Sequence, residues 1–110
     1  MVKEHEILIY STEGGVEPFQ KWIHSIKDAK TQRIILTRIQ RLRAGLFGDS
    51  KFLAQGIHEL RIDYGPGYRV YYALIGEKTI LLLDGGDKST QDKDITMAKN
   101  HLLDHRKRYR

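Results

Sequence analysis

The side chains best suited to chemistry in this chain lie between residues 58 and 94. Arg61 and Arg69 flank a Gly-Pro-Gly turn sequence at 65–67, and Lys88 follows a Gly-Gly-Asp sequence. Three cations that converge on one point can hold a phosphate group and stabilise the charge that develops on it during a reaction. The residue types and their spacing therefore predict an anion site, and phosphate is the anion that we expect there.

Two strands must position the arginines. Apolar and polar residues alternate over 57–64 and 68–75, which is the pattern of strands, and the Gly-Pro-Gly sequence between them predicts a hairpin with a three-residue connection. In that register Arg61 lies opposite Tyr71. Arg61 and Arg69 then become diagonal neighbours on one face of the sheet.

Carboxylates on the same face allow a second interpretation. Glu59 shares the face of Arg61, and the predicted register places Asp63 opposite Arg69. An ion-pair ladder on an exposed sheet would then account for the arginines without any ligand. The sequence leaves both interpretations open at this point.

A different segment must position Lys88. Residues 80–83 are wholly apolar, which predicts a central strand covered on both faces, and an Asp-Gly-Gly-Asp-Lys sequence follows at 84–88. Paired glycines allow close approach to the backbone, and a helix that Thr90 caps would offer free N–H groups to a phosphate. The alternative is an ordinary turn with Asp87 and Lys88 in solvent.

The rest of the chain supplies the supporting elements. The pattern predicts a strand at 6–11, a helix that begins at Pro18, a second helix at about 31–46 and a C-terminal helix after Thr90; residues 51–53 fit either a short strand or a loop. We therefore predict a single α+β domain over residues 1–110. It would contain an N-terminal strand, a two-helix hairpin, a three- to four-stranded antiparallel meander and a C-terminal helix.

Composition limits the classes of function. The chain has 110 residues, of which 40% are hydrophobic and 30% charged, as expected for a folded soluble domain. It contains no cysteine, which fits a cytoplasmic location, and shows no signal peptide and no apolar run of membrane-spanning length. The five histidines have no metal-binding spacing, and His58 falls on the core face of its strand. We expect no metal, no cofactor and no membrane partner.

The charge distribution favours a polyanionic partner. The net charge is +5, and the two predicted helices carry most of the excess. Between Phe19 and Gly48 a single acid, Asp28, stands against seven cations, which are Lys21, Lys27, Lys30, Arg33, Arg38, Arg41 and Arg43. Solvated helix faces are the alternative explanation of such a run.

Three sequence segments together resemble a known family. They are ELR at 59–61, YGPGYRVYY at 64–72 and GGDKSTQDKDI at 85–95. In these segments the chain is similar to the addiction-module killer proteins, also described as phage-derived Gp49-like or HigB-like proteins, of the RelE/ParE toxin superfamily. The resemblance implies a RelE-like fold and the toxin of a type II toxin–antitoxin system.

The same resemblance implies partners and a reaction. The partner would be a helix-turn-helix antitoxin encoded alongside, and operator DNA would be bound only through the complex with it. In ribonuclease members the activity is cleavage of mRNA on the translating ribosome, without a metal, by attack of a 2′-hydroxyl on the adjacent phosphate.

Individual residues can be matched to the motifs of the family. The arginine of the central Tyr-Arg pair, which contacts the scissile phosphate in RelE-like members, matches Arg69, and a second basic residue matches Lys88 approximately. On that basis we expect Arg69 to stabilise the phosphate and Arg61 to orient the backbone or support Arg69. We expect Lys88 to neutralise leaving-group charge, and Asp87 or Gln91 to position the 2′-hydroxyl.

Other residues are predicted to bind RNA rather than to react with it. Tyr71 shares the predicted cleaving face, and Gln91 lies at the start of the last helix. Arg38 and Arg41 of the basic helices would contact ribosomal RNA, together with Lys51, through salt-sensitive phosphate contacts.

The resemblance leaves the general base open. RelE itself uses lysines where this chain has Ile57 and Glu59, and a tyrosine where it has Asp94 or Ile95. Asp87 could serve as the base if burial raised its pKa, or the site could act by charge alone.

Two other functions fit the same fold. One is a non-enzymatic inhibitor of DNA gyrase, as in ParE-like toxins. The other is an inactive module that binds the antitoxin and acts as a co-repressor.

Overall fold

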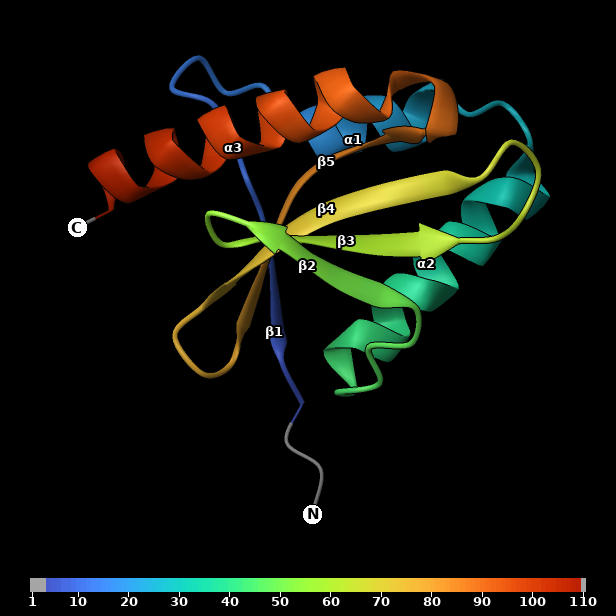
Figure 1. Ribbon diagram of the computed structural model, residues 1–110, viewed down its shortest axis with the longest axis horizontal. Coiled ribbons are helices and arrows are strands. Elements are labelled where there is room, and N and C mark those ends of the chain that lie inside the picture. Colours follow the sequence, from blue (N-terminus) through green and yellow to red (C-terminus); the bar gives the residue numbers. More distant parts are fainter. Residues whose placement is uncertain (1–3, 110) are drawn as a thin grey trace.

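The computed structural model describes residues 4–109 and shows three layers, with helices on both faces of one sheet (Figure 1). The elements follow one another as β1 (Glu6–Ile9), α1 (Pro18–Ser25), α2 (Ala29–Arg43), β2 (Ser50–Ala54), β3 (Ile57–Ile62), β4 (Tyr68–Ile75), β5 (Thr79–Asp87), the 3-10 turn η1 (Lys88–Thr90) and α3 (Gln91–Arg108). The predicted α+β class and sequence of elements are confirmed, and residues 51–53 belong to a strand.

The sheet is mixed, with strand order β1-β5-β4-β3-β2. The strands β2 to β5 form the predicted antiparallel meander, whereas β1 pairs parallel with β5, so that Ile7 lies beside Ile80 and Ile9 beside Leu82. The sequence alone did not place β1. This pairing makes the apolar segment of β5 central, as its composition predicted.

Two separate cores explain the three layers. On one face, α1 and α2 pack on a cluster that includes Phe19, Ile35, Leu60, Val70 and Ile80. On the other face, α3 packs on a cluster that includes Tyr10, Tyr71, Leu81, Leu83, Ala98 and Leu102. The alternation of side chains along each strand sends neighbouring residues to opposite cores, so α3 can reach only one of the two faces.

The helix α2 begins and ends earlier than the sequence predicted. Asp28 caps it, because its carboxylate accepts a hydrogen bond from the backbone N–H of Thr31 at 3.3 Å. Gly45 adopts a φ of 84° just past the last helical turn, and this left-handed residue ends the helix before Leu46. Leu46 therefore lies outside the apolar stripe and is exposed.

The register of the β3–β4 hairpin differs from the prediction by two residues. Arg61 lies directly opposite Arg69, and Glu59 lies opposite Tyr71, because the connection spans residues 63–67 rather than 65–67. The N–H of Gly67 donates to the carbonyl of Tyr64 at 3.1 Å, so Tyr64 belongs to the turn instead of the strand. A shift of two residues leaves every side chain on its predicted face.

The paired glycines lie in β5 rather than in a loop. Gly85 and Gly86 pair with residues of β4, and neither glycine has a positive φ. A Cβ atom on Gly85 would collide with the Trp22 ring of α1, and one on Gly86 would collide with the Asp94 carboxylate of α3. The predicted close approach to the backbone therefore occurs, but the groups that approach are protein side chains from both helix layers.

Candidate anion site

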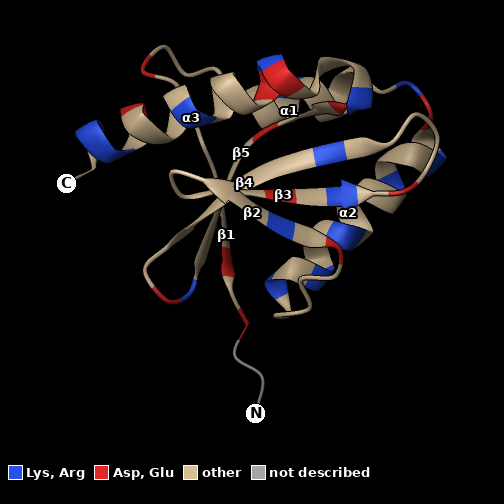
Figure 2. Cartoon of the chain, in the orientation of Figure 1, with Lys and Arg blue, Asp and Glu red and all other residues tan. Residues whose placement is uncertain are grey.

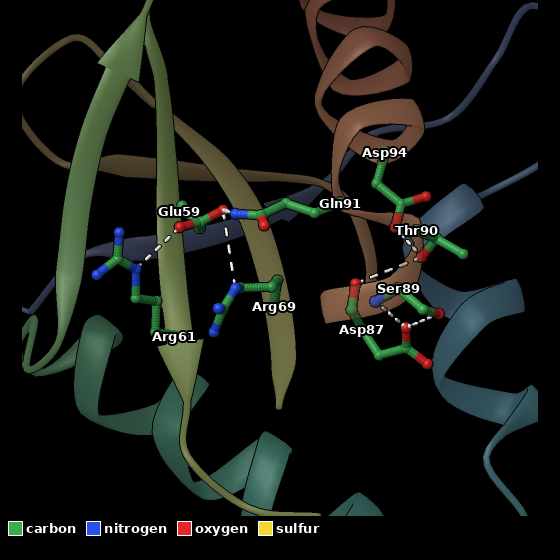
Figure 3. Close-up of polar contacts among 8 residues, drawn as sticks. All are labelled: Glu59, Arg61, Arg69, Asp87, Ser89, Thr90, Gln91 and Asp94. Atoms are coloured by element: carbon green, nitrogen blue, oxygen red, sulfur yellow. Dashed lines mark hydrogen bonds and ion pairs between the residues drawn. The ribbon is translucent and has the colours of Figure 1, made fainter. Parts of the chain in front are cut away.

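The site lies on the α3 face of β3 and β4, beside the first turn of α3. Two cross-strand rows share the α3 face of the sheet: Lys51, Glu59, Tyr71 and Asp84 form one, and Arg61, Arg69 and Gly86 form the next. The first turn of α3 reaches the first row through Gln91 (Figure 3). The arginine row remains more open, with 35% of the Arg61 side chain and 15% of the Arg69 side chain exposed.

Glu59 connects the two arginines to α3. Its side chain has no exposed surface. Its Oε1 accepts a hydrogen bond from Arg61 Nε at 3.0 Å, and its Oε2 accepts one from Gln91 Nε2 at 2.8 Å. Arg69 Nε lies 3.9 Å from the same Oε2, within ion-pair but not hydrogen-bond distance. The hydrogen bond to Glu59 raises the pKa of the Arg61 guanidinium above its ordinary value.

An open depression of about 370 Å³ adjoins the arginines. It is lined by Arg61, Arg69, Lys88, the turn at 65–67, Asp49 and Asp63. Lys88 reaches it because η1 follows β5 directly, and its Cβ lies 3.8 Å from the position that a Cβ on Gly67 would occupy. The three predicted cations therefore line one depression, where they can bind an anion.

Asp87 does not have the environment predicted for a general base. It is half-exposed, and its carboxylate accepts hydrogen bonds from the N–H of Ser89 at 2.8 Å and from the Ser89 hydroxyl at 2.5 Å. These bonds lower the pKa of Asp87 instead of raising it. Asp87 caps η1, and the predicted cap Thr90 instead donates its hydroxyl to Asp94 at 2.5 Å.

Tyr71 is wholly buried, which argues against the predicted direct contact with RNA. The helix α3 covers it, because Tyr71 belongs to the second core. Its hydroxyl has no hydrogen-bond partner among residues 4–109. Burial, followed by the nearby charges of Glu59 and Asp94, raises the pKa of Tyr71.

The other predicted RNA-binding residues lie at different distances from the depression. Arg38 extends from α2 and donates to the carbonyl of Arg61 at 3.1 Å, so it supports the end of β3. Lys51 is exposed on β2, opposite Glu59. Arg41 lies elsewhere, in an open basic depression on α2 that Lys30 and Arg33 also line. Figure 2 shows lysine and arginine along α2 and on β2, β3 and β4.

Two carboxylates in this region were not predicted as functional. The sequence predicts Glu59 only as a member of an exposed ion-pair ladder. Its place in the strand alternation, on the same face as Arg61 and Arg69, is the signal that points to a closer association with them. Asp84 is half-buried at the base of a groove between α1 and α3, and burial raises its pKa to about 6. Its sequence position gave no such signal, because the burial depends on how two distant helices meet.

His58 lies on the core face, as predicted. Its ring stacks on Tyr72 with a centroid distance of 5.1 Å and meets Phe52 edge-on at 5.1 Å. Burial lowers the pKa of His58. Across residues 4–109, no helix is long and apolar enough to cross a membrane, and no three His, Asp or Glu side chains are grouped to hold a metal ion.

The fold and the family match together define a class of protein. An N-terminal strand, a helix pair, an antiparallel meander and a C-terminal helix are consistent with a RelE-like fold. Residues 21–108 match the family described as "Phage derived protein Gp49-like", so the chain belongs to that family, within the addiction-module killer and RelE-like toxin group.

The chain also has a similar relative in a bacterium. The chain is 51% identical over 81 residues to an uncharacterized protein of Haemophilus influenzae, in an alignment that covers 74% of this chain and 82% of the relative. Membership of the Gp49-like family indicates a toxin of a toxin–antitoxin system and points to an antitoxin as its partner.

Proposed function

We propose that this protein is an mRNA endoribonuclease that cleaves messages on the translating ribosome in the cytoplasm and so inhibits translation. The observation that carries the proposal is the convergence of Arg61, Arg69 and Lys88 on one depression beside the hairpin turn. A helix-turn-helix antitoxin would neutralise the protein, and the pair would bind operator DNA together.

The proposed reaction is an internal transfer of the phosphate. The 2′-oxygen of one nucleotide forms a bond to the adjacent phosphorus, and the bond from phosphorus to the 5′-oxygen breaks. The 2′-hydroxyl loses its proton to solvent, and the 5′-oxygen gains one from solvent. Arg69 and Arg61 would stabilise the added negative charge on the phosphate, and Lys88 the charge on the leaving oxygen.

This mechanism depends on charge more than on a strong base. Asp87 has a lowered pKa and Glu59 has no exposed surface, so neither carboxylate is suited to accept the 2′-proton. Removal of a single charge-stabilising donor from such a site costs about 10²–10³ in rate.

Induced expression followed by mapping of mRNA 5′ ends tests the proposal. Wild type should arrest growth and create new 5′ ends within translated messages, and Arg69→Ala should reduce their formation by about 10²-fold. Lys107→Ala, an exposed change at the far end of α3, is the matched control and should behave as wild type.

Three results would contradict the proposal or part of it. Undiminished cleavage by Arg69→Ala would remove Arg69 from the site. Inhibition of DNA supercoiling by the purified protein, without RNA cleavage, would favour a ParE-like gyrase inhibitor. No growth arrest in the absence of the antitoxin would favour the inactive co-repressor.

A further inference from the structure

The arginine pair in this site needs an explanation in the free protein. Arg61 and Arg69 lie directly opposite each other on adjacent strands, and like charges in that position destabilise a sheet. Both side chains are partly buried, which increases the repulsion because water screens it less. The wholly buried Glu59 lies beside both and supplies the compensating charge.

The contacts of Glu59 involve a particular atom of each arginine. Arg61 donates through Nε at 3.0 Å, and the closest approach of Arg69, 3.9 Å, is also through Nε (Figure 3). These contacts use neither of the two terminal nitrogens, Nη1 and Nη2, of either arginine. Gln91 occupies the second oxygen at 2.8 Å, and so fixes the carboxylate from α3.

We propose that Glu59, held by Gln91, is a positioning residue that aligns Arg61 and Arg69 through their Nε atoms and leaves their distal nitrogens for a phosphodiester. The inference rests on the proposed function for the identity of the phosphate as that of RNA. Glu59 has no exposed surface and both of its oxygens are engaged, so it acts through the arginines and not on the substrate.

The balance of charge between Glu59 and the two arginines predicts that Glu59→Gln affects binding and turnover differently. Glu59 cancels one of the two arginine charges, so Glu59→Gln leaves a more positive depression around Arg61, Arg69 and Lys88. Attraction for RNA should therefore persist or increase, whereas alignment of the guanidiniums is lost. A residue with only a structural role would lower binding and turnover together.

The first experiment separates binding from turnover. Purified Glu59→Gln should bind RNA at least as tightly as wild type, and its cleavage rate at saturating RNA should fall by at least about tenfold. Gln91→Leu, which keeps the carboxylate but removes its support, should show a smaller loss of rate than Glu59→Gln. Cleavage by Glu59→Gln at the wild-type rate would overturn the inference, and so would a parallel loss of affinity and rate.

A second experiment does not depend on cleavage. Arginine Nε–H signals in NMR spectra should show slow exchange with water for Arg61 in wild type and fast exchange in Glu59→Gln. Inorganic phosphate should shift the Arg61 and Arg69 signals together in wild type, whereas in the variant it should still bind but should no longer shift the two signals together. If wild type cleaves no RNA, the proposed function fails, and these signals still decide the role of Glu59.

The two variants together keep the inference testable. If Glu59→Gln does not fold, Gln91→Leu decides the question by the same measurements. Arg61 exchange and cleavage identical to wild type in a folded Gln91→Leu would overturn the role assigned to the pair.

Discussion

At the scale of single residues, Tyr71 differs most from the role that its sequence position suggested. Its hydroxyl lies beside a charged network without a hydrogen bond to any of residues 4–109. A buried hydroxyl without a partner costs free energy, so its removal should be tolerated. The buried ring, by contrast, should matter for stability, because it fills the core below α3.

We predict that Tyr71→Phe leaves the free energy of unfolding unchanged or raises it by up to about 1 kcal/mol, with cleavage unaffected. Denaturant unfolding and the cleavage assay measure the two quantities. Tyr10→Phe is the matched control, because the Tyr10 hydroxyl donates to Asp104 at 2.6 Å and the loss of this hydrogen bond should cost about 0.5–1.5 kcal/mol. A loss of RNA affinity in Tyr71→Phe, without a loss of stability, would support the direct contact with RNA that the sequence predicted for Tyr71.

Asp84 should make stability depend on pH. Burial raises the pKa of Asp84 to about 6, well above the ordinary range of an aspartate, so the folded state binds a proton more tightly than the unfolded state. The stabilisation is present below about pH 4 and is lost as the pH rises through about 6. Asp84→Asn should therefore gain about 1–2 kcal/mol relative to wild type between pH 4 and pH 7, after allowance for solvent screening.

The comparison of Asp84→Asn with wild type isolates this effect. Buried histidines, which have lowered pKa values, produce the opposite trend, but they are common to both proteins. Asparagine can also keep the hydrogen bond that Asp84 accepts from the N–H of Gly85 at 2.8 Å. Denaturant unfolding at four pH values measures the difference, and a difference that is constant with pH would contradict the prediction.

At the scale of elements, the second half of β5 joins both helix layers. Gly85 and Gly86 leave room for Trp22 on one face and Asp94 on the other. We predict that Gly85→Ala destabilises the fold by about 1–3 kcal/mol, because the rigid indole and the packed α1 must move. Gly86→Ala should cost less, since the end of the Asp94 side chain can rotate away.

Thermal or denaturant unfolding of the glycine variants tests this interpretation. Gly14→Ala is the matched control, because its added Cβ would make only an ordinary contact with Thr12 and its φ is not positive. Equal stability of Gly85→Ala and Gly14→Ala would mean that the packing of α1 on the sheet does not require the close approach of Trp22 to Gly85.

The hairpin shows how far the sequence predicts the site. The alternation in β3 and β4 correctly placed Arg61, Arg69 and Glu59 on one face, and a register error of two residues preserves that result. The length of the turn depends on a local hydrogen bond at Tyr64, which composition did not reveal. The burial of Tyr71 depends on α3, which lies far along the chain, so strand patterning alone could not predict it.

At the scale of the whole molecule, two separate clusters of positive charge each line a depression. Arg61, Arg69 and Lys88 line the proposed cleavage site, whereas Lys30, Arg33 and Arg41 line an open depression on α2. Helix α2 packs on the sheet face opposite α3. The first cluster should act on the reacting phosphate, and the second should contribute only attraction to ribosomal RNA.

We predict that neutralising the α2 cluster with glutamine at Lys30, Arg33 and Arg41 weakens binding to ribosomes and leaves the cleavage rate at saturation unchanged. Three lost phosphate contacts should also reduce the slope of log affinity against log salt concentration by about 2 to 3. Binding measured at several salt concentrations gives both quantities.

The control for this prediction carries the same change of net charge. Glutamine at Lys78, Lys99 and Lys107 removes three cations outside both depressions, so it should alter the salt slope much less. Equal effects of the two triple variants would show that net charge, and not the α2 surface, attracts the ribosome. A fall in the saturated cleavage rate of the α2 variant would instead place this surface in the catalytic step, because pure attraction changes only the occupancy of the complex.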